Sequence, residues 1–190
     1  MLMSSHHPQH KQPRIPPFEE HEWPDEQRSM LEYTYRKGVV YNVVGTLARH
    51  AEASKVIGQV SNHVMGPNST LSARDRELLI LRTAWLCRAE YEWAQHVLLA
   101  RKAGLNEAEI ARCKEGPEAS EWPTLEANLL RAADELHANQ RVGDATWAEL
   151  SQHYGTLQMM DVVFAVGQYT LIAMALNTFG TPLDEGLNGF

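Results

Sequence analysis

The segment that most limits how this chain can fold lies near its end. Residues 156–180, "TLQMMDVVFAVGQYTLIAMALNTFG", carry a single charged side chain and finish on a glycine, which commonly ends a helix. The segment predicts one long helix, and apolar residues occupy nearly every side of it. Such a helix must be covered all round. We therefore expect it either to pass through the centre of the domain or to be covered by a neighbouring subunit.

The rest of the chain also carries helix start signals. Ser72, followed three positions later by Asp75, predicts a capped helix start, and Asn106 with Glu109 predicts another. Asp144 is expected to cap the helix "DATWAELSQHY". No stretch alternates convincingly between apolar and polar residues with a period of two, as a half-buried strand would. The sequence therefore predicts an all-α fold of about seven or eight helices.

The domain organisation follows from the distribution of proline. Residues 1–24 are polar and proline-rich, and proline removes backbone donors and fixes φ. We expect a flexible N-terminal segment over 1–24 and a single domain over 25–190. The first helix expected in that domain is "PDEQRSMLEYTYRKG", which has acids in its first turn and a basic, glycine-terminated end.

Composition narrows the classes of partner. The net charge of −7 repels a phosphate backbone, and no cluster of Lys and Arg offsets it, so we expect no nucleic-acid partner. The chain shows no signal peptide at its start and no uninterrupted apolar run of the roughly 18–20 residues that cross a bilayer. We therefore expect no membrane partner and a cytoplasmic location. The two cysteines form neither a Cys-x-x-Cys motif nor a disulfide framework.

The window "LCRAEYEWAQH", residues 86–96, concentrates reactive side chains. On a helix, Glu92 and His96 lie one turn apart on the same face, where a carboxylate can hold an imidazole and set its tautomer. Tyr91 and Trp93 flank them and are expected to line an apolar pocket. Glu77 lies in the preceding helix, and a tight turn near Cys87 would bring it back toward Glu92 as a second carboxylate.

Several alternatives compete with acid–base chemistry in this window. A Glu–His pair four residues apart is also a common surface pair with little energetic value. Cys87 is the candidate for a reactive thiol, but a cysteine at a helix end in apolar surroundings is often a packing residue. Glu77, Glu92 and His96 offer oxygen and nitrogen ligands to a divalent ion. However, no second histidine stands at ligand spacing, and we expect neither a metal site nor a cofactor.

The stretch "LSARDRELLILRTAWLCRAEYEWAQHVLLARKAGLNEAEI" resembles the carboxymuconolactone decarboxylase family, which also contains the alkylhydroperoxidase D-like proteins. The resemblance extends more weakly to "RIPPF" and to "VGQYTLIAMALNTFGTPLDEG". It implies an all-helical bundle built around a helical hairpin. It also implies homo-oligomers, commonly trimers or hexamers, with a dimer as a further form, in which helices pack between subunits.

The alkylhydroperoxidase D branch carries a Cys-x-x-Cys-x-x-x-His motif with a glutamate fifteen residues before the second cysteine. When the motif is aligned on His96, that glutamate falls on Glu77. The two cysteine positions fall on Ala89 and Glu92, so both redox thiols are absent. Cys87 lies two positions outside the motif.

The resemblance therefore favours a cofactor-free decarboxylase-like enzyme acting on a small lactone or enolisable carboxylic acid. His96 would move the proton, Glu92 would orient it and Glu77 would tune the site. Two alternatives stay open. One is a peroxidase-like antioxidant activity using Cys87, which the missing cysteine pair weakens. The other is a non-catalytic helical oligomer that binds a small ligand.

Overall fold

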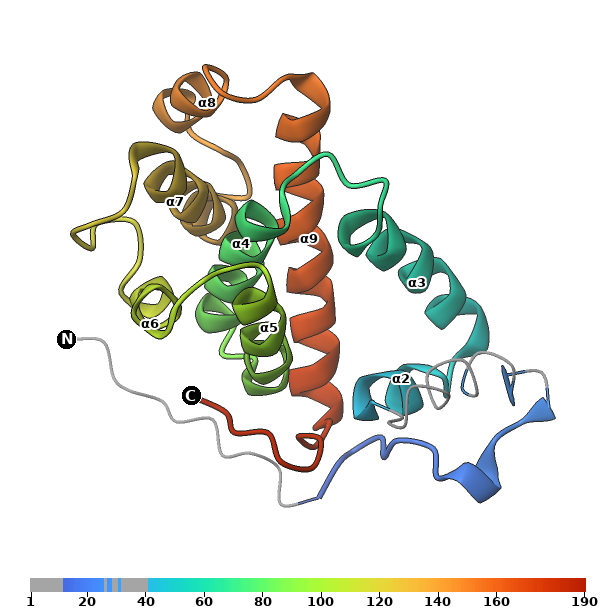
Figure 1. The fold of residues 1–190 in the computed structure, drawn as a ribbon. Coiled ribbons are helices and arrows are strands. Elements are labelled where there is room, and N and C mark those ends of the chain that lie inside the picture. The colour runs from blue at the N-terminus through green and yellow to red at the C-terminus, as the bar shows by residue number, and fades with distance from the viewer. Residues whose placement is uncertain (1–11, 26, 29–30, 32–40) are drawn as a thin grey trace.

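The computed structural model describes residues 12–25, 27–28, 31 and 41–190, and these residues form helices without any strand (Figure 1). A short 3-10 helix, η1 (Glu20–Glu22), precedes eight α-helices in the described part of the chain. They are α2 (Asn42–Leu47), α3 (Ala51–Met65), α4 (Ala73–Leu86), α5 (Glu90–Lys102), α6 (Glu107–Glu115), α7 (Thr124–Asn139), α8 (Asp144–Leu150) and α9 (Thr156–Phe179). The all-α prediction is confirmed. The helix expected from "PDEQRSMLEYTYRKG" falls largely outside the described residues.

The predicted caps explain most of the helix boundaries. The Ser72 side chain accepts from the backbone N–H of Asp75 at 3.0 Å, and Asn106 and Glu109 form a complete capping box. The prediction for Asp144 is wrong by one position, because Gly143 is the N-cap and Asp144 is the first helical residue. That helix also ends earlier than expected, at Leu150, because the next residues form turns.

Helix α4 is the centre of the bundle, and α5, α6, α7 and α9 all pack against it (Figure 1). Every residue from Glu77 to Ala84 is buried, so this helix has no solvent face along two turns. The run Leu78–Leu81 is completely inaccessible to solvent. A helix buried on all sides forms the core that its neighbours cover, and its few polar residues must find partners inside the protein.

Arg82 is the residue of α4 that fixes two of its neighbours. Its guanidinium makes two hydrogen bonds to the Asp134 carboxylate of α7, from Nε at 2.5 Å and from Nη2 at 3.0 Å. Its Nη1 donates to the carbonyl oxygens of Cys113 and Lys114 at 3.0 and 2.9 Å. These carbonyls belong to the last turn of α6, where helix carbonyls lack partners within the helix. One side chain therefore ties α4 to both α6 and α7.

The helical hairpin expected between α4 and α5 is confirmed, because the two helices pack together along their length. Arg88 makes the reversal possible with a φ of 53°, which is uncommon for a residue other than glycine. Only three residues, 87–89, separate the two helices. This short connection places the beginning of α5 directly beside the end of α4.

Helix α9 runs through the molecule, with α4, α5 and α7 on one side and α3 on the other (Figure 1). By length and composition it is apolar enough to cross a membrane, unlike the sequence expectation, but 56% of its apolar window is buried inside the protein, as in a core helix. It is not covered all round. Leu157, Met160, Phe164 and Met174 are among its exposed apolar residues.

The segments on either side of the helical core hold each other in place. The backbone N–H groups of Arg14 and Ile15 donate to the carbonyl of Phe179 at the end of α9. The Asp184 carboxylate, after α9, accepts from the backbone N–H of Asn42 at 2.7 Å. The described part of the proline-rich segment therefore contacts the domain. The flexibility of residues 1–24 and the boundary at residue 24 stay predictions.

We predict that Arg82→Met lowers the free energy of unfolding by about 3 kcal/mol, because it leaves the Asp134 carboxylate and two helix-end carbonyls without their donor. The matched control is Arg141→Met, which removes an exposed ion pair with Asp144 and is expected to cost less than about 1 kcal/mol. Urea unfolding of the three proteins measures the difference. Equal losses in the two variants would show that Arg82 does not hold the bundle together.

Candidate functional site

The centre of the candidate site is a buried pair between α4 and α5. His96 Nδ1 lies 2.7 Å from Glu77 Oε2, and both side chains are less than a tenth exposed. With Glu77 as the carboxylate, Nδ1–H is the donor, and the Nε2 atom is left to accept or deliver a proton. The pair therefore has the arrangement of an oriented general base.

Glu92 does not take the role that helical spacing predicts. Its carboxylate is 2% exposed, and neither of its oxygens has a hydrogen-bond partner in the described structure. Glu77, from the neighbouring helix, orients His96 instead. Burial raises the pKa of Glu92 well above its ordinary value of 4.5. The correction has a simple cause, because residues four apart on one helix lie one above the other and are not forced into contact.

Two residues that the sequence reasoning missed complete the surroundings of this pair. Tyr169 of α9 packs edge-on against His96, with ring centroids 4.7 Å apart. Burial, together with the charges of Glu92 and Glu77, raises the pKa of Tyr169. Arg76 Nε lies 3.6 Å from Glu77 Oε1. The sequence feature that could have pointed to Tyr169 is its polar side chain within the apolar run of the last helix.

Tyr91 serves a different purpose from the predicted pocket wall. Its hydroxyl donates to Asp184 Oδ2 at 2.5 Å and accepts from the backbone N–H of Val43 at 3.2 Å. Gln95 donates to the same Asp184 oxygen. Burial and this carboxylate raise the pKa of Tyr91. Tyr91 therefore joins α5 to the start of α2 and to the segment that follows α9.

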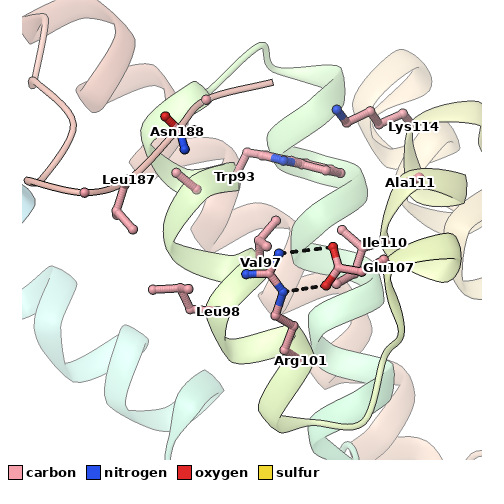
Figure 2. Close-up of a pocket in the computed structure, with 13 residues that line it drawn as sticks. Trp93, Val97, Leu98, Arg101, Glu107, Ile110, Ala111, Lys114, Leu187 and Asn188 are labelled. Atoms are coloured by element: carbon pink, nitrogen blue, oxygen red, sulfur yellow. Dashed lines mark hydrogen bonds and ion pairs between the residues drawn. The ribbon is translucent and has the colours of Figure 1, made fainter.

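Trp93 lines a groove, but the groove does not include Glu77 or His96 among its lining residues (Figure 2). The groove measures about 330 Å³ and lies between α5, α6 and residues 186–189. Lys114 Nζ sits 4.9 Å from the Trp93 ring centroid, and an ion pair between Arg101 and Glu107 closes another part of the wall. Phe190 packs edge-on against Trp93 at 5.9 Å.

Cys87 is poorly suited to be a reactive thiol. Burial and, to a smaller extent, the nearby Glu92 charge raise the pKa of its thiol to about 11. Cys87 lies at the C-terminal end of α4, and its sulfur is 3.7 Å from Nδ1 of His137. Cys113 is fully buried and its pKa is raised to about 12 by burial. Both cysteines are free, and at neutral pH both are protonated thiols.

A metal site is not assembled from the residues that the structure describes, where no group of three His, Cys, Asp or Glu side chains is arranged to hold an ion. Glu77 and His96 meet each other directly. The remaining candidate ligand, Glu92, forms no hydrogen bond with Glu77 or His96.

Comparison with known proteins shows a likeness to one family. The sequence model of the carboxymuconolactone decarboxylase family matches residues 51–135, which include Glu77, Glu92 and His96. Through these residues the chain is similar to the carboxymuconolactone decarboxylase family. No curated protein matches the sequence significantly. When the alkylhydroperoxidase D motif is aligned on His96, Ala89 and Glu92 stand at its two cysteine positions, so the aligned positions hold no dithiol.

Solved structures show that this chain has the alkylhydroperoxidase D-like fold. A peroxidase-related protein from Ralstonia eutropha, described as an alkylhydroperoxidase AhpD core, superposes with a TM-score of 0.81 at 20% identity, over 93% of this chain and 94% of that one. A peroxidase-related protein from a Silicibacter species gives 0.76 at 18% identity, over 85% and 86%. The debrominase Bmp8 in complex with 2,3,4-tribromopyrrole gives 0.74 at 10% identity, over 90% and 91%.

The raised pKa of Glu92 predicts a specific pH dependence of stability. The folded protein keeps the Glu92 proton at pH values where the unfolded chain, with a pKa near 4.5, has lost it. Folding therefore takes up a proton, and above the unfolded pKa this group lowers stability by about 1.4 kcal/mol for each pH unit, until the folded pKa is reached.

Glu92→Gln removes this contribution, so the variant should gain stability over the wild type as the pH rises from about 5 to about 8. Urea unfolding across that range measures the gain, with the exposed Glu149→Gln as the control. Parallel stability curves for Glu92→Gln and wild type would mean that Glu92 is ionised in the folded protein.

Proposed function

We propose that this protein is a carboxy-lyase-like enzyme that uses acid–base chemistry, without a cofactor, on a small lactone or related enolisable carboxylic acid. The observation that carries the proposal is the buried contact between Glu77 and His96 at 2.7 Å. An oriented imidazole in surroundings from which water is excluded is suited to moving one proton to or from carbon.

The proposed reaction divides the work between these two side chains. The bond between the substrate carbon and its carboxylate breaks, carbon dioxide leaves, and the electron pair stays on the substrate as an enolate. His96, in its protonated form, gives a proton to the carbon, and Glu77 stabilises the imidazolium from the Nδ1 side. The histidine then regains its proton from water. Atoms and charge balance without an oxidant or a reductant.

The surroundings of the pair favour a small, compact substrate. Glu77, Glu92 and His96 are each at most 6% exposed, so a substrate must replace side-chain contacts to reach them. The related debrominase fold is seen in complex with 2,3,4-tribromopyrrole, a small ring compound. That precedent supports a small ring compound as the substrate here.

The structure gives no support to a thiol peroxidase reaction in this chain. Such a reaction begins with a thiolate, and the pKa of Cys87 is about 11. A second thiol would then have to close a disulfide. Cys113, the other cysteine, is fully buried in α6. The family likeness to peroxidase-related proteins therefore concerns the fold, and the acid–base proposal is the better supported of the two.

Substitution of the pair tests the proposal. With carboxymuconolactone as the first substrate, His96→Ala and Glu77→Gln should each lower the rate of carbon dioxide release by about 10²- to 10⁴-fold, because each removes the oriented proton carrier. Cys87→Ala should retain the wild-type rate. If Cys87→Ala abolished turnover while the other variants kept it, the reaction would depend on the thiol and the proposal would fail.

We also propose that the protein assembles as a homo-oligomer through the exposed face of α9. One face of α9 carries exposed apolar residues at successive intervals of three, four, seven and three positions: Leu157, Met160, Phe164, Leu171 and Met174. Gly167 fills the step between Phe164 and Leu171, so the spacing is that of a coiled-coil seam. A seam of this kind is self-complementary, and a second copy of α9 matches it in length and in chemistry.

The double variant Leu171→Lys with Met174→Lys should dissociate this assembly, because each lysine places a charge in the apolar seam. Trp147→Lys, which changes an exposed apolar residue on α8, is the control. Sedimentation equilibrium at micromolar concentration measures the mass of each protein. A monomeric wild type would overturn the proposal, as would a double variant that keeps the wild-type mass.

A further inference from the structure

The groove between α5, α6 and residues 186–189 is a concave surface that the proposed reaction does not use (Figure 2). Its volume of about 330 Å³ lies at the lower end of the range for cavities that hold small ligands. Neither Glu77 nor His96 belongs to its lining, so the groove is separate from the buried acid–base pair. Its walls include the apolar side chains of Trp93, Val97, Leu98, Ile110 and Ala111.

Lys114, in the last turn of α6, gives the groove a cation that has no anionic partner in the described part of the chain. Its Nζ lies among three aromatic rings, 4.9 Å from the centroid of Trp93, 5.3 Å from that of Trp85 and 5.8 Å from that of Phe190. Rings at these distances attract a cation. They leave the three N–H donors of the ammonium free, and no described side chain accepts from them.

Arg101, the other cation in the described lining of the groove, is already paired. Its guanidinium donates to both carboxylate oxygens of Glu107, from Nε at 2.6 Å and from Nη2 at 3.1 Å. Figure 2 shows this ion pair at one end of the groove and the Lys114 ammonium toward the other. An anionic ligand would therefore bind at the Lys114 end.

Trp93 supplies a second donor near Lys114. The residue is only 4% exposed, yet its indole N–H makes no hydrogen bond within the residues that the structure describes. An indole N–H can donate but not accept, and a donor removed from water is stabilised by an acceptor. Trp93 and Lys114 thus present donors alone. A carboxylate is the matching group, because both of its oxygens only accept.

The aromatic cluster around Lys114 holds both donors in place. Trp85 packs edge-on against Trp93 with ring centroids 6.1 Å apart, and Phe190 packs edge-on against these two rings at 4.9 and 5.9 Å. Trp85 and Phe190 do not line the groove, so they support the two donors without meeting a ligand themselves. Binding then requires little further ordering of side chains.

We propose that this groove binds a small aromatic monocarboxylate, with its carboxylate on the donors of Lys114 and Trp93 and its ring against Val97 and Ile110. The apolar walls match the ring, and the unpaired ammonium matches one negative charge. A phosphate monoester would bring a second charge without a second free cation in the described lining. The inference does not rest on the proposed function, because neither residue of the acid–base pair contributes to the groove.

Calorimetric titration with three probes tests the class of ligand. Benzoate has both the ring and the charge, benzamide keeps the ring without the charge, and acetate keeps the charge without the ring. Benzamide and acetate should each bind about 10-fold or more weakly than benzoate, because each gives up one matched part. Acetate that binds as tightly as benzoate would overturn the aromatic assignment. Wild-type protein that does not bind benzoate at millimolar concentration would overturn the inference as a whole.

Two pairs of variants test the place of binding. Lys114→Met keeps the aliphatic part of the side chain and should weaken benzoate binding by about 10-fold. Its control is Lys102→Met, at an exposed lysine of α5 outside the groove, which should bind as the wild type does. Ala111→Phe fills the groove from an exposed position on α6 and should abolish binding, whereas Ala108→Phe, exposed on the same helix and outside the lining, should not.

A spectroscopic readout locates the bound benzoate directly. Proton–nitrogen correlation spectra show the indole N–H resonance of Trp93, which Trp93→Phe identifies by its disappearance. Benzoate should shift this resonance, and His96→Ala should bind benzoate with wild-type affinity. Binding that is lost in His96→Ala and kept in Lys114→Met would place the anion at the buried pair and overturn the inference. Wild-type protein that binds benzoate in the groove but does not turn over carboxymuconolactone would refute the proposed function alone.

Discussion

The structure depends on one helix that is buried on every side and that nevertheless carries charge. Helix α4 presents Arg82 and Glu77 to the interior, and each must meet a partner from another helix. Arg82 finds Asp134 and the last carbonyls of α6, while Glu77 finds His96 of α5. These contacts are directional, unlike the surrounding apolar packing. They fix the register of three helices against α4, and the candidate site is one of these packing contacts.

The exchange of a thiol position for a glutamate changes what the fold can do with the same geometry. The alkylhydroperoxidase D motif that the sequence resembles, when aligned on His96, places a cysteine where Glu92 stands. A thiol there would need to be ionised to react, whereas a carboxyl group excluded from water keeps its proton. The local environment that would hinder thiolate formation is therefore suited to a proton donor. Cys87, two positions outside the motif, is less buried than Glu92, and burial still raises the pKa of its thiol to about 11.

Local sequence signals predicted much of this fold, but they could not predict the contacts between helices. The capping residues Ser72 and Asn106 marked helix starts correctly, because a cap acts within one turn. The pairing of His96 was assigned to Glu92 because that residue is near in sequence, while the structure pairs it with Glu77, nineteen positions away. Tyr169 was missed for the same reason. The crossing geometry of α4, α5 and α9 decides such pairs, and it depends on the packing of the whole core.

The course of α9 has a consequence for where this protein can be divided. The residues that match the family, 51–135, end before α9 begins, yet α9 packs against α3, α4 and α5 and places Tyr169 against His96. The region recognised by common descent is therefore smaller than the unit that folds. A fragment cut to the family boundaries would expose the apolar side of α4 and open the site to water. In this molecule the part of the chain needed to close the core and the site includes residues beyond those that match the family.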